Sequence, residues 1–154
     1  MNLFLAEPYM IDTNVLIYAT LAEDPRHEIA VKVLEARLDG TSKAYVSTQN
    51  LAEMYPNLTG PKTQPSDSPD LAREKIRTIG SLPRLEVLSV TRGIVETTLR
   101  LCAERGIVRQ RYFDAQIVAT MLENQIQTIV TENDKDFEGF EFLRVVNPFK
   151  ALSE

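Results

Sequence analysis

An acidic side chain stands at the junction of two apolar segments near the start of the chain. Asp12 follows the run "YMI" and is followed closely by the run "VLIYA". A carboxylate between two buried segments loses part of its hydration, so its charge must be compensated. A structural hydrogen bond, a helix cap or a bound cation could each provide that compensation, and other residues of the chain must discriminate among the three.

Further acidic residues occur at comparable places later in the chain. Glu53 lies in "STQNLAEMY", in a predicted helix that directly follows an apolar strand. Asp114 lies in "RYFDAQIVATM", in the first turn of another predicted helix. The segment "TIVTENDKDF" ends a strand at a threonine and then offers several oxygen-bearing side chains in the predicted turn: Asn133, Asp134 and Asp136.

Each of these acids has an ordinary structural explanation when taken alone. Asp12 could cap a helix, Glu53 could be a solvated surface residue and Asp114 could complement a helix dipole. The acidic segment 132–136 could be turn chemistry. Together, however, four acids at one edge of a sheet would repel each other unless cations lay among them.

Carboxylate oxygens are hard ligands, which suit Mg²⁺ or Mn²⁺ better than zinc. The chain has a single histidine, His27, which is too few for an imidazole site. A carboxylate cluster holding one or two such ions can cleave phosphodiesters, because the ions orient hydroxide and stabilise charge on the attacking and leaving oxygens. The acids therefore favour a metal-dependent hydrolase.

The elements that must position these acids alternate along the chain. Hydrophobic patterning predicts strands at 8–11, 44–47, 85–90, 128–131 and 142–148. It predicts helices at 13–21, 24–38, 48–58, 68–81, 91–105 and 113–124, the second with Asp24 as N-cap, Pro25 in its first turn and Gly40 as its stop. Such short apolar strands indicate a three-layer α/β/α sandwich with a mainly parallel central sheet. In that architecture ligands bind beyond the carboxyl ends of the strands.

Length and composition bound the answer further. The 154 residues are 44% hydrophobic and 25% charged, as expected for a single globular domain spanning 1–154. The formal charge of −5 argues mildly against a nucleic-acid binder, although bound divalent ions would neutralise part of it. Cys102 is the only cysteine, there is no basic leader and no apolar stretch is long enough to span a membrane. We therefore expect a cytoplasmic protein.

Four segments taken in order resemble a known family. "MIDTNVLIYA", "STQNLAEMY", "RYFDAQIVATM" and "TIVTENDKDF" are similar to the motifs of the PIN domain, and most closely to those of VapC-type ribonuclease toxins of type II toxin–antitoxin pairs. The resemblance covers about Tyr9 to Pro148. It implies an endoribonuclease that depends on Mg²⁺ or Mn²⁺ and hydrolyses RNA phosphodiester bonds.

The resemblance also implies roles for individual residues. Three acids would bind the metal and the activated water: Asp12, Glu53 and Asp114. Relatives place the fourth acid at the position of Asn133 or at that of Asp136, and Asp136 is the expected ligand here, with Asn133 as a neutral helper. Asn14 and Thr131 would support the site through hydrogen bonds.

Substrate and partner surfaces are less well defined by the sequence. Arg109 and Arg111 lie close to Asp114 in the chain and could hold RNA phosphates. The resemblance implies a homodimer and a small antitoxin that covers the site, with the helices at 24–38 and 68–81 as candidate surfaces. The loop 59–69 departs from the compact family pattern, and its role stays open.

Other functions are compatible with parts of this pattern. A PIN-fold nuclease could act in RNA processing or on DNA, and a PIN fold without activity could serve only as a binding protein. A phospho-acceptor signalling domain also gathers acids around Mg²⁺ at a sheet edge, but it needs two adjacent acids after the first strand. Here Asp12 is followed by Thr13, which disfavours that class.

Overall fold

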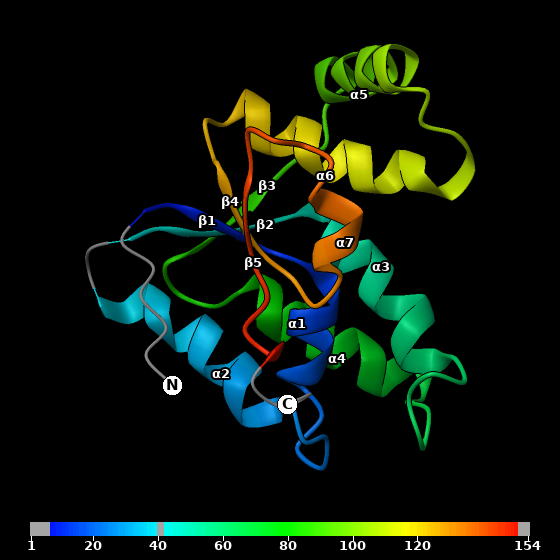
Figure 1. Ribbon diagram of the computed structural model, residues 1–154. Coiled ribbons are helices and arrows are strands. Elements are labelled where there is room, and N and C mark those ends of the chain that lie inside the picture. The colour runs from blue at the N-terminus through cyan, green and yellow to red at the C-terminus, as the bar shows by residue number, and fades with distance from the viewer. Residues whose placement is uncertain (1–6, 40–41, 151–154) are drawn as a thin grey trace.

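A sheet of five parallel strands forms the centre of the computed structural model, which describes residues 7–39 and 42–150 (Figure 1). Its order is β3-β2-β1-β4-β5, so the first strand lies in the middle. The chain builds outward from β1 on one side and then returns to build the other side. The strands are β1 (Tyr9–Ile11), β2 (Ala44–Ser47), β3 (Leu85–Leu88), β4 (Thr128–Val130) and β5 (Arg144–Val146).

Helices connect these strands, as parallel pairing requires. Their bounds are α1 (Thr13–Tyr18), α2 (His27–Glu35), α3 (Thr48–Thr59), α4 (Pro69–Gly80), α5 (Arg92–Arg105), α6 (Tyr112–Glu123) and α7 (Asp134–Phe137). Short 3-10 segments cover Ala36–Asp39 and Arg109–Arg111. In the described part of the chain, every helix is too short or too polar to cross a membrane.

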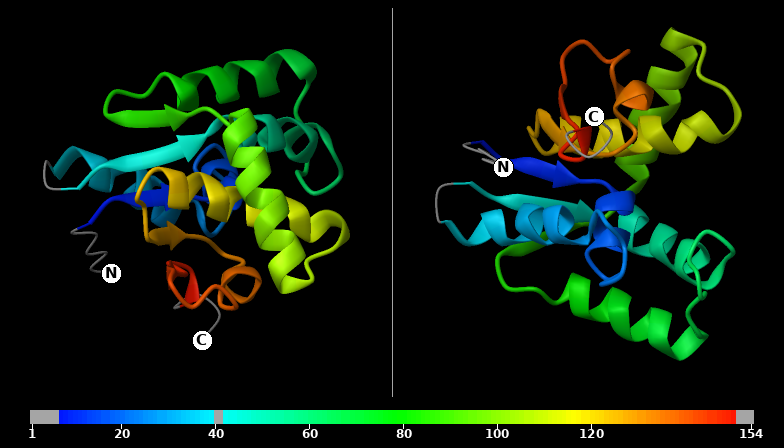
Figure 2. Two further views of the ribbon diagram at one scale, coloured as in Figure 1. Left: turned by 90° about the horizontal axis from the view of Figure 1, so that it is seen from above. Right: turned by 60° about the horizontal axis from the view of Figure 1, so that its bottom comes forward.

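The helices cover both faces of the sheet, which creates two separate cores (Figures 1 and 2). Side chains alternate between the faces along β1: Tyr9 and Ile11 pack with α1–α4, whereas Met10 packs with α5, α6 and α7. The three residues are fully buried, which explains why this strand has no polar position. The predicted α/β/α sandwich with a parallel sheet is therefore confirmed.

Two of the predicted helices differ from the structure at their ends. The first helix ends at Tyr18, earlier than expected. The second begins at His27 because the Asp24 carboxylate accepts a hydrogen bond from the Arg26 N–H at 2.8 Å, which closes a turn before the helix instead of capping it. It then tightens into the 3-10 segment after Glu35, and the predicted stop at Gly40 lies outside the described residues.

The structure also contains a helix that the sequence does not predict. The acidic turn after β4 forms the short α7, with Asn133 in the preceding position. Its Phe137 is buried against the core that contains α5 and α6, so tertiary packing orders a segment too short to be helical alone.

The junction of β2 and α3 is fixed by a reciprocal cap. The Ser47 hydroxyl accepts from the Asn50 backbone N–H, and the Asn50 side-chain oxygen accepts from the Ser47 backbone N–H at 2.8 Å. The Asn50 amide also donates to the Thr13 hydroxyl of α1 at 3.1 Å. Asn50 is fully buried, so one side chain joins the second strand, its following helix and the first helix.

We expect Asn50→Ala to reduce the free energy of unfolding by about 2 kcal/mol, because it leaves the buried Ser47 N–H without an acceptor. Urea denaturation would measure the loss. Ser68→Ala is the matched control, since Ser68 caps α4 through a single exposed hydrogen bond and should cost only about 1 kcal/mol. Equal losses for the two variants would contradict the importance of the buried cap.

Candidate active site

Asp12 lies at the carboxyl ends of β1 and β4. Between these two strands the chain changes from building one side of the sheet to building the other. Its N–H continues the sheet by donating to the Val130 carbonyl at 3.0 Å. Its carboxylate accepts from the Thr13 N–H at 2.8 Å and from the Thr131 hydroxyl at 2.7 Å. Asp12 therefore does cap α1, and it also presents a buried carboxylate at the position where parallel sheets bind ligands.

Asn14 orients this corner from the other side. Its side-chain oxygen accepts from the Glu132 backbone N–H at 3.1 Å, so its amide nitrogen points toward the Asp12 carboxylate and the Thr131 hydroxyl, each 3.4 Å away. The Thr131 hydroxyl also accepts from the Asn133 N–H at 3.0 Å. Of the three residues expected to support the site, Asn14 and Thr131 thus contact Asp12, and Asn133 contacts Thr131.

Glu53 reaches the site from α3. Its two carboxylate oxygens are held separately: one accepts from the Thr13 hydroxyl at 3.1 Å and the other from the Gln49 amide at 2.6 Å. Gln49 precedes Glu53 by four residues, the spacing that places two side chains on the same face of a helix. The carboxylate is therefore fixed from α1 and from its own helix.

A buried amide pair joins this acid to the helix that carries Asp114. The Gln49 amide nitrogen also donates to the Phe113 carbonyl at 2.9 Å, and the Gln49 oxygen accepts from the Gln116 amide at 2.7 Å. The Gln116 oxygen in turn accepts from the Tyr112 hydroxyl at 2.9 Å. Both polar atoms of the Gln49 side chain are therefore hydrogen-bonded. These bonds set the spacing between Glu53 on α3 and Asp114 on α6.

The candidates for the fourth acid lie in and just before α7. Asp136 is exposed but lies close enough to raise the pKa of both Asp12 and Asp114 through repulsion. Asp134 instead accepts from Asn147 at 3.0 Å and pairs with Lys150 at 3.3 Å, which lowers its pKa. Asn133 lines the cavity beside Asp12. The Asp134 carboxylate is thus held by Asn147 and Lys150. Asp136 is the acid of α7 whose charge raises the pKa of Asp12 and Asp114.

Burial and mutual repulsion shift the pKa of two of the carboxyl groups. The pKa of Asp12 rises to about 6, chiefly through desolvation, with Glu53 and Asp136 adding repulsion against the hydrogen bonds from Thr131 and Thr13. The pKa of Asp114 also rises to about 6 through desolvation and the charges of its acidic neighbours, and Arg111 opposes the rise. Three acids therefore act on Asp114 at once, which is the electrostatic signature of a carboxylate cluster.

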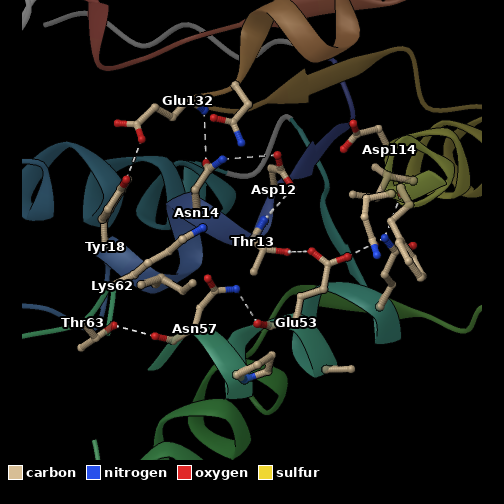
Figure 3. A pocket seen from close by; sticks show the side chains of 18 of the residues that line it. Asp12, Thr13, Asn14, Tyr18, Glu53, Asn57, Lys62, Thr63, Asp114 and Glu132 are labelled. Carbon is tan, nitrogen blue, oxygen red and sulfur yellow. Dashed lines mark hydrogen bonds between the residues drawn. The ribbon is translucent and has the colours of Figure 1, made fainter. Parts of the chain in front are cut away.

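The three acids face one cavity of about 1050 Å³ (Figure 3). The carboxylates of Asp12, Glu53 and Asp114 point toward the same space from the junction of β1 and α1, from α3 and from α6. Of the two arginines predicted to bind substrate, neither is among the residues that line this cavity, whereas the intervening Gln110 is. Within residues 7–39 and 42–150, no three acidic, cysteine or histidine side chains already stand as a ligand set for a metal ion.

Sequence reasoning missed the polar residues that hold the acids. They are Thr13, Gln49, Asn50 and Gln116, and all four are buried. The four-residue spacing of Gln49 and Glu53 was a usable local signal. Gln116 carried another, because a glutamine within the apolar run after Asp114 must find a partner when that helix is buried.

Comparison with known proteins places this arrangement in a family. Residues 9–143 match the PIN domain model. The chain belongs to the PIN domain family. This PIN domain is 31% identical over 143 residues to "Ribonuclease VapC24" of Mycobacterium tuberculosis, an alignment that covers 92% of the chain and 97% of that relative.

Solved structures show the same fold. The chain superposes on VapBC2 from Rickettsia felis, solved with a DNA fragment from its promoter, with a TM-score of 0.65 and 20% identity, covering 91% of this chain and 98% of that one. VapBC-1 from nontypeable Haemophilus influenzae gives a TM-score of 0.64 at 20% identity, covering 93% and 99%. At such identities the likeness supports the fold alone.

The raised pKa of Asp114 predicts a pH-dependent effect of removing its charge. Because the folded-state pKa lies above the unfolded value, ionised Asp114 destabilises the fold at neutral pH, and this cost disappears as the pH falls from about 7 toward 4. In chelator, Asp114→Asn should raise the melting temperature by about 3 °C at neutral pH, a modest amount because the side chain is partly exposed. The gain should shrink toward zero near the acidic limit.

Thermal melts across this pH range would check the prediction. Asp70→Asn is the control, since Asp70 is exposed on α4 away from the cavity and should show no comparable gain. A destabilised Asp114→Asn at neutral pH would contradict the repulsion described above.

Proposed function

We propose that this chain is a divalent-metal-dependent endoribonuclease, a single nuclease domain that hydrolyses RNA phosphodiester bonds as the toxin of a toxin–antitoxin pair. The observation that carries the proposal is the convergence of Asp12, Glu53 and Asp114 on one cavity at the carboxyl edge of the sheet. The ribonuclease names of its curated relatives support the reaction and the substrate class.

The donor set fits Mg²⁺ or Mn²⁺. It consists of carboxylate oxygens, which both ions prefer, and repulsion among these carboxylates would be relieved by a cation. Asp12, Glu53 and Asp114 would hold the ion, with Asp136 as the fourth acid. When bound, the ion supplies Lewis-acid stabilisation of charge on the phosphate and a nucleophilic hydroxide at neutral pH.

The surrounding residues prepare the acids for that task. Thr131 and Asn14 orient Asp12, and the oxygens of Glu53 are held by Thr13 and Gln49. These contacts use only part of each carboxylate's accepting capacity, so oxygen lone pairs remain toward the cavity. Among the described residues no hydrogen bond holds the Asp114 carboxylate, and its pKa is raised to about 6, so it is suited to accept a proton from substrate or water at its Oδ atoms.

The proposed partners follow from the same family membership. The solved neighbours include toxin–antitoxin complexes, which supports a small antitoxin for this chain. We extend the proposal to a homodimer in the cytoplasm, consistent with a single cysteine that has no internal disulfide partner. Arg109 and Arg111 remain proposed RNA contacts outside the cavity, Arg111 acting close to Asp114.

Cleavage of labelled RNA by the purified protein tests the proposal directly. We expect the wild-type protein to cleave structured or single-stranded RNA with Mg²⁺ or Mn²⁺ and to lose activity in excess chelator. Asp114→Asn should lower the rate by at least about 100-fold, because it removes an ionised oxygen ligand from the reaction centre. Asp70→Asn should cleave at the wild-type rate. Cleavage that survives both chelator and Asp114→Asn would exclude this site.

Gln49 is expected to act as a positioning residue. Gln49→Ala removes the amide that holds Glu53 and joins α3 to α6, so about tenfold more Mg²⁺ should be needed for the half-maximal rate. A metal titration of cleavage would measure this shift, and Gln127→Ala, on an exposed side chain, is the control. An unchanged metal requirement in a folded Gln49→Ala protein would show that the amide pair is only structural.

A further inference from the structure

The long loop after α3 places a lysine in the active-site cavity. Lys62 lines the same cavity as the three acids, beside Asn57 and Thr63. Figure 3 shows its side chain extended from the loop toward Thr13 and Asn14, the two residues that follow Asp12. The loop therefore contributes a charge to the site in addition to connecting two helices.

The backbone on both sides of Lys62 is held in place. At Gly60 a Cβ atom would come within 2.6 Å of the Pro56 carbonyl oxygen, so the tight exit from α3 requires glycine. Thr63 is buried and its hydroxyl donates to the Asn57 carbonyl at 2.9 Å. Further along, Asp67 pairs with Lys75 of α4 at 2.8 Å. Lys62 itself is exposed, so a fixed backbone carries a side chain that can move.

The charges that line the cavity are unevenly matched. Five acids line it: Asp12, Asp24, Glu53, Asp114 and Glu132. Two cations line it, and Arg26 is already engaged, since it pairs with Asp24 at 2.9 Å and with Glu132 at 3.0 Å and stacks on the Tyr18 ring. Lys62 forms none of the ion pairs seen among the described residues. Its ammonium group is therefore available to a ligand.

We propose that Lys62 is a substrate-binding residue that holds a backbone phosphate of the RNA strand while the carboxylates act on the scissile phosphodiester. The inference rests on the proposed function, because that substrate is a chain of phosphates passing through this cavity. An RNA strand beside Asp12, Glu53 and Asp114, the lining acids that Arg26 does not pair with, needs cationic contacts besides any metal ion. A lysine ammonium is a compact, mobile charge that binds a phosphate without demanding a fixed geometry.

RNA binding without turnover tests this role. In an Asp114→Asn background, with Mg²⁺ present, fluorescence anisotropy would follow a labelled short single-stranded RNA at several salt concentrations. Adding Lys62→Ala should weaken binding about fivefold and reduce the slope of log K against log salt by about 0.7, the loss of one phosphate contact. Lys32→Ala, which removes an exposed lysine of α2 outside the cavity, should leave both quantities unchanged.

Cleavage by the otherwise wild-type protein completes the test. Lys62→Ala should raise KM about fivefold with little change in kcat. Lys62→Arg keeps the positive charge and should have a KM close to that of the wild-type protein. If the wild-type protein cleaves RNA but Lys62→Ala behaves like Lys32→Ala, the inference is overturned and the nuclease function stands. If Lys62-dependent binding appears without cleavage, the phosphate contact stands and the nuclease function fails. Faster cleavage by Lys62→Ala would mean that Lys62 competes with the metal for the acids, which also overturns the inference.

Discussion

Burial of the Asp12 carboxylate at the end of the central strand is the constraint on which the rest of the site depends. Desolvation disfavours this charge, and neighbouring acids disfavour it further. Hydrogen bonds from the Thr131 hydroxyl and the Thr13 N–H oppose both effects but do not cancel them, since the pKa of Asp12 still rises to about 6. The folded protein therefore holds an electrostatically unfavourable carboxylate at Asp12, and a bound divalent cation would stabilise its charge.

The remaining acids are tied to that point through buried polar side chains. Thr13 accepts from Asn50 and donates to Glu53, while Gln49 and Gln116 continue the connection to α6. A fully satisfied network of this kind rigidifies a site, since each group left unpaired in a dry interior costs free energy. The acids come from elements far apart in the sequence, yet their separation is set by a few amide and hydroxyl groups.

The loop of residues 60–68 adds a feature of another kind. Its ends are anchored by a glycine at a close backbone approach and by a nearly buried ion pair, so its length does not imply disorder. It places one positive charge, that of the exposed Lys62, in the cavity that the acids line. The chain is acidic overall, so positive charge placed locally matters more for a polyanionic substrate than net charge does.

The order of the strands and helices and three acids of the candidate site could be predicted from the sequence. Asp12, Glu53 and Asp114 each stand at a fixed local distance from an apolar strand or helix start, and local spacing is what hydrophobic periodicity reports. The start of α2 at His27 was less predictable, because a side-chain turn at Asp24 competes with helix capping. The sequence also favoured Asp136 over Asp134, but it did not predict that Gln49 pairs with Gln116, 67 residues away, or that Lys62 lines the cavity of the acids. These contacts depend on how α3, α6 and a loop pack around the sheet, and no local pattern encodes the distance between elements so far apart in the chain.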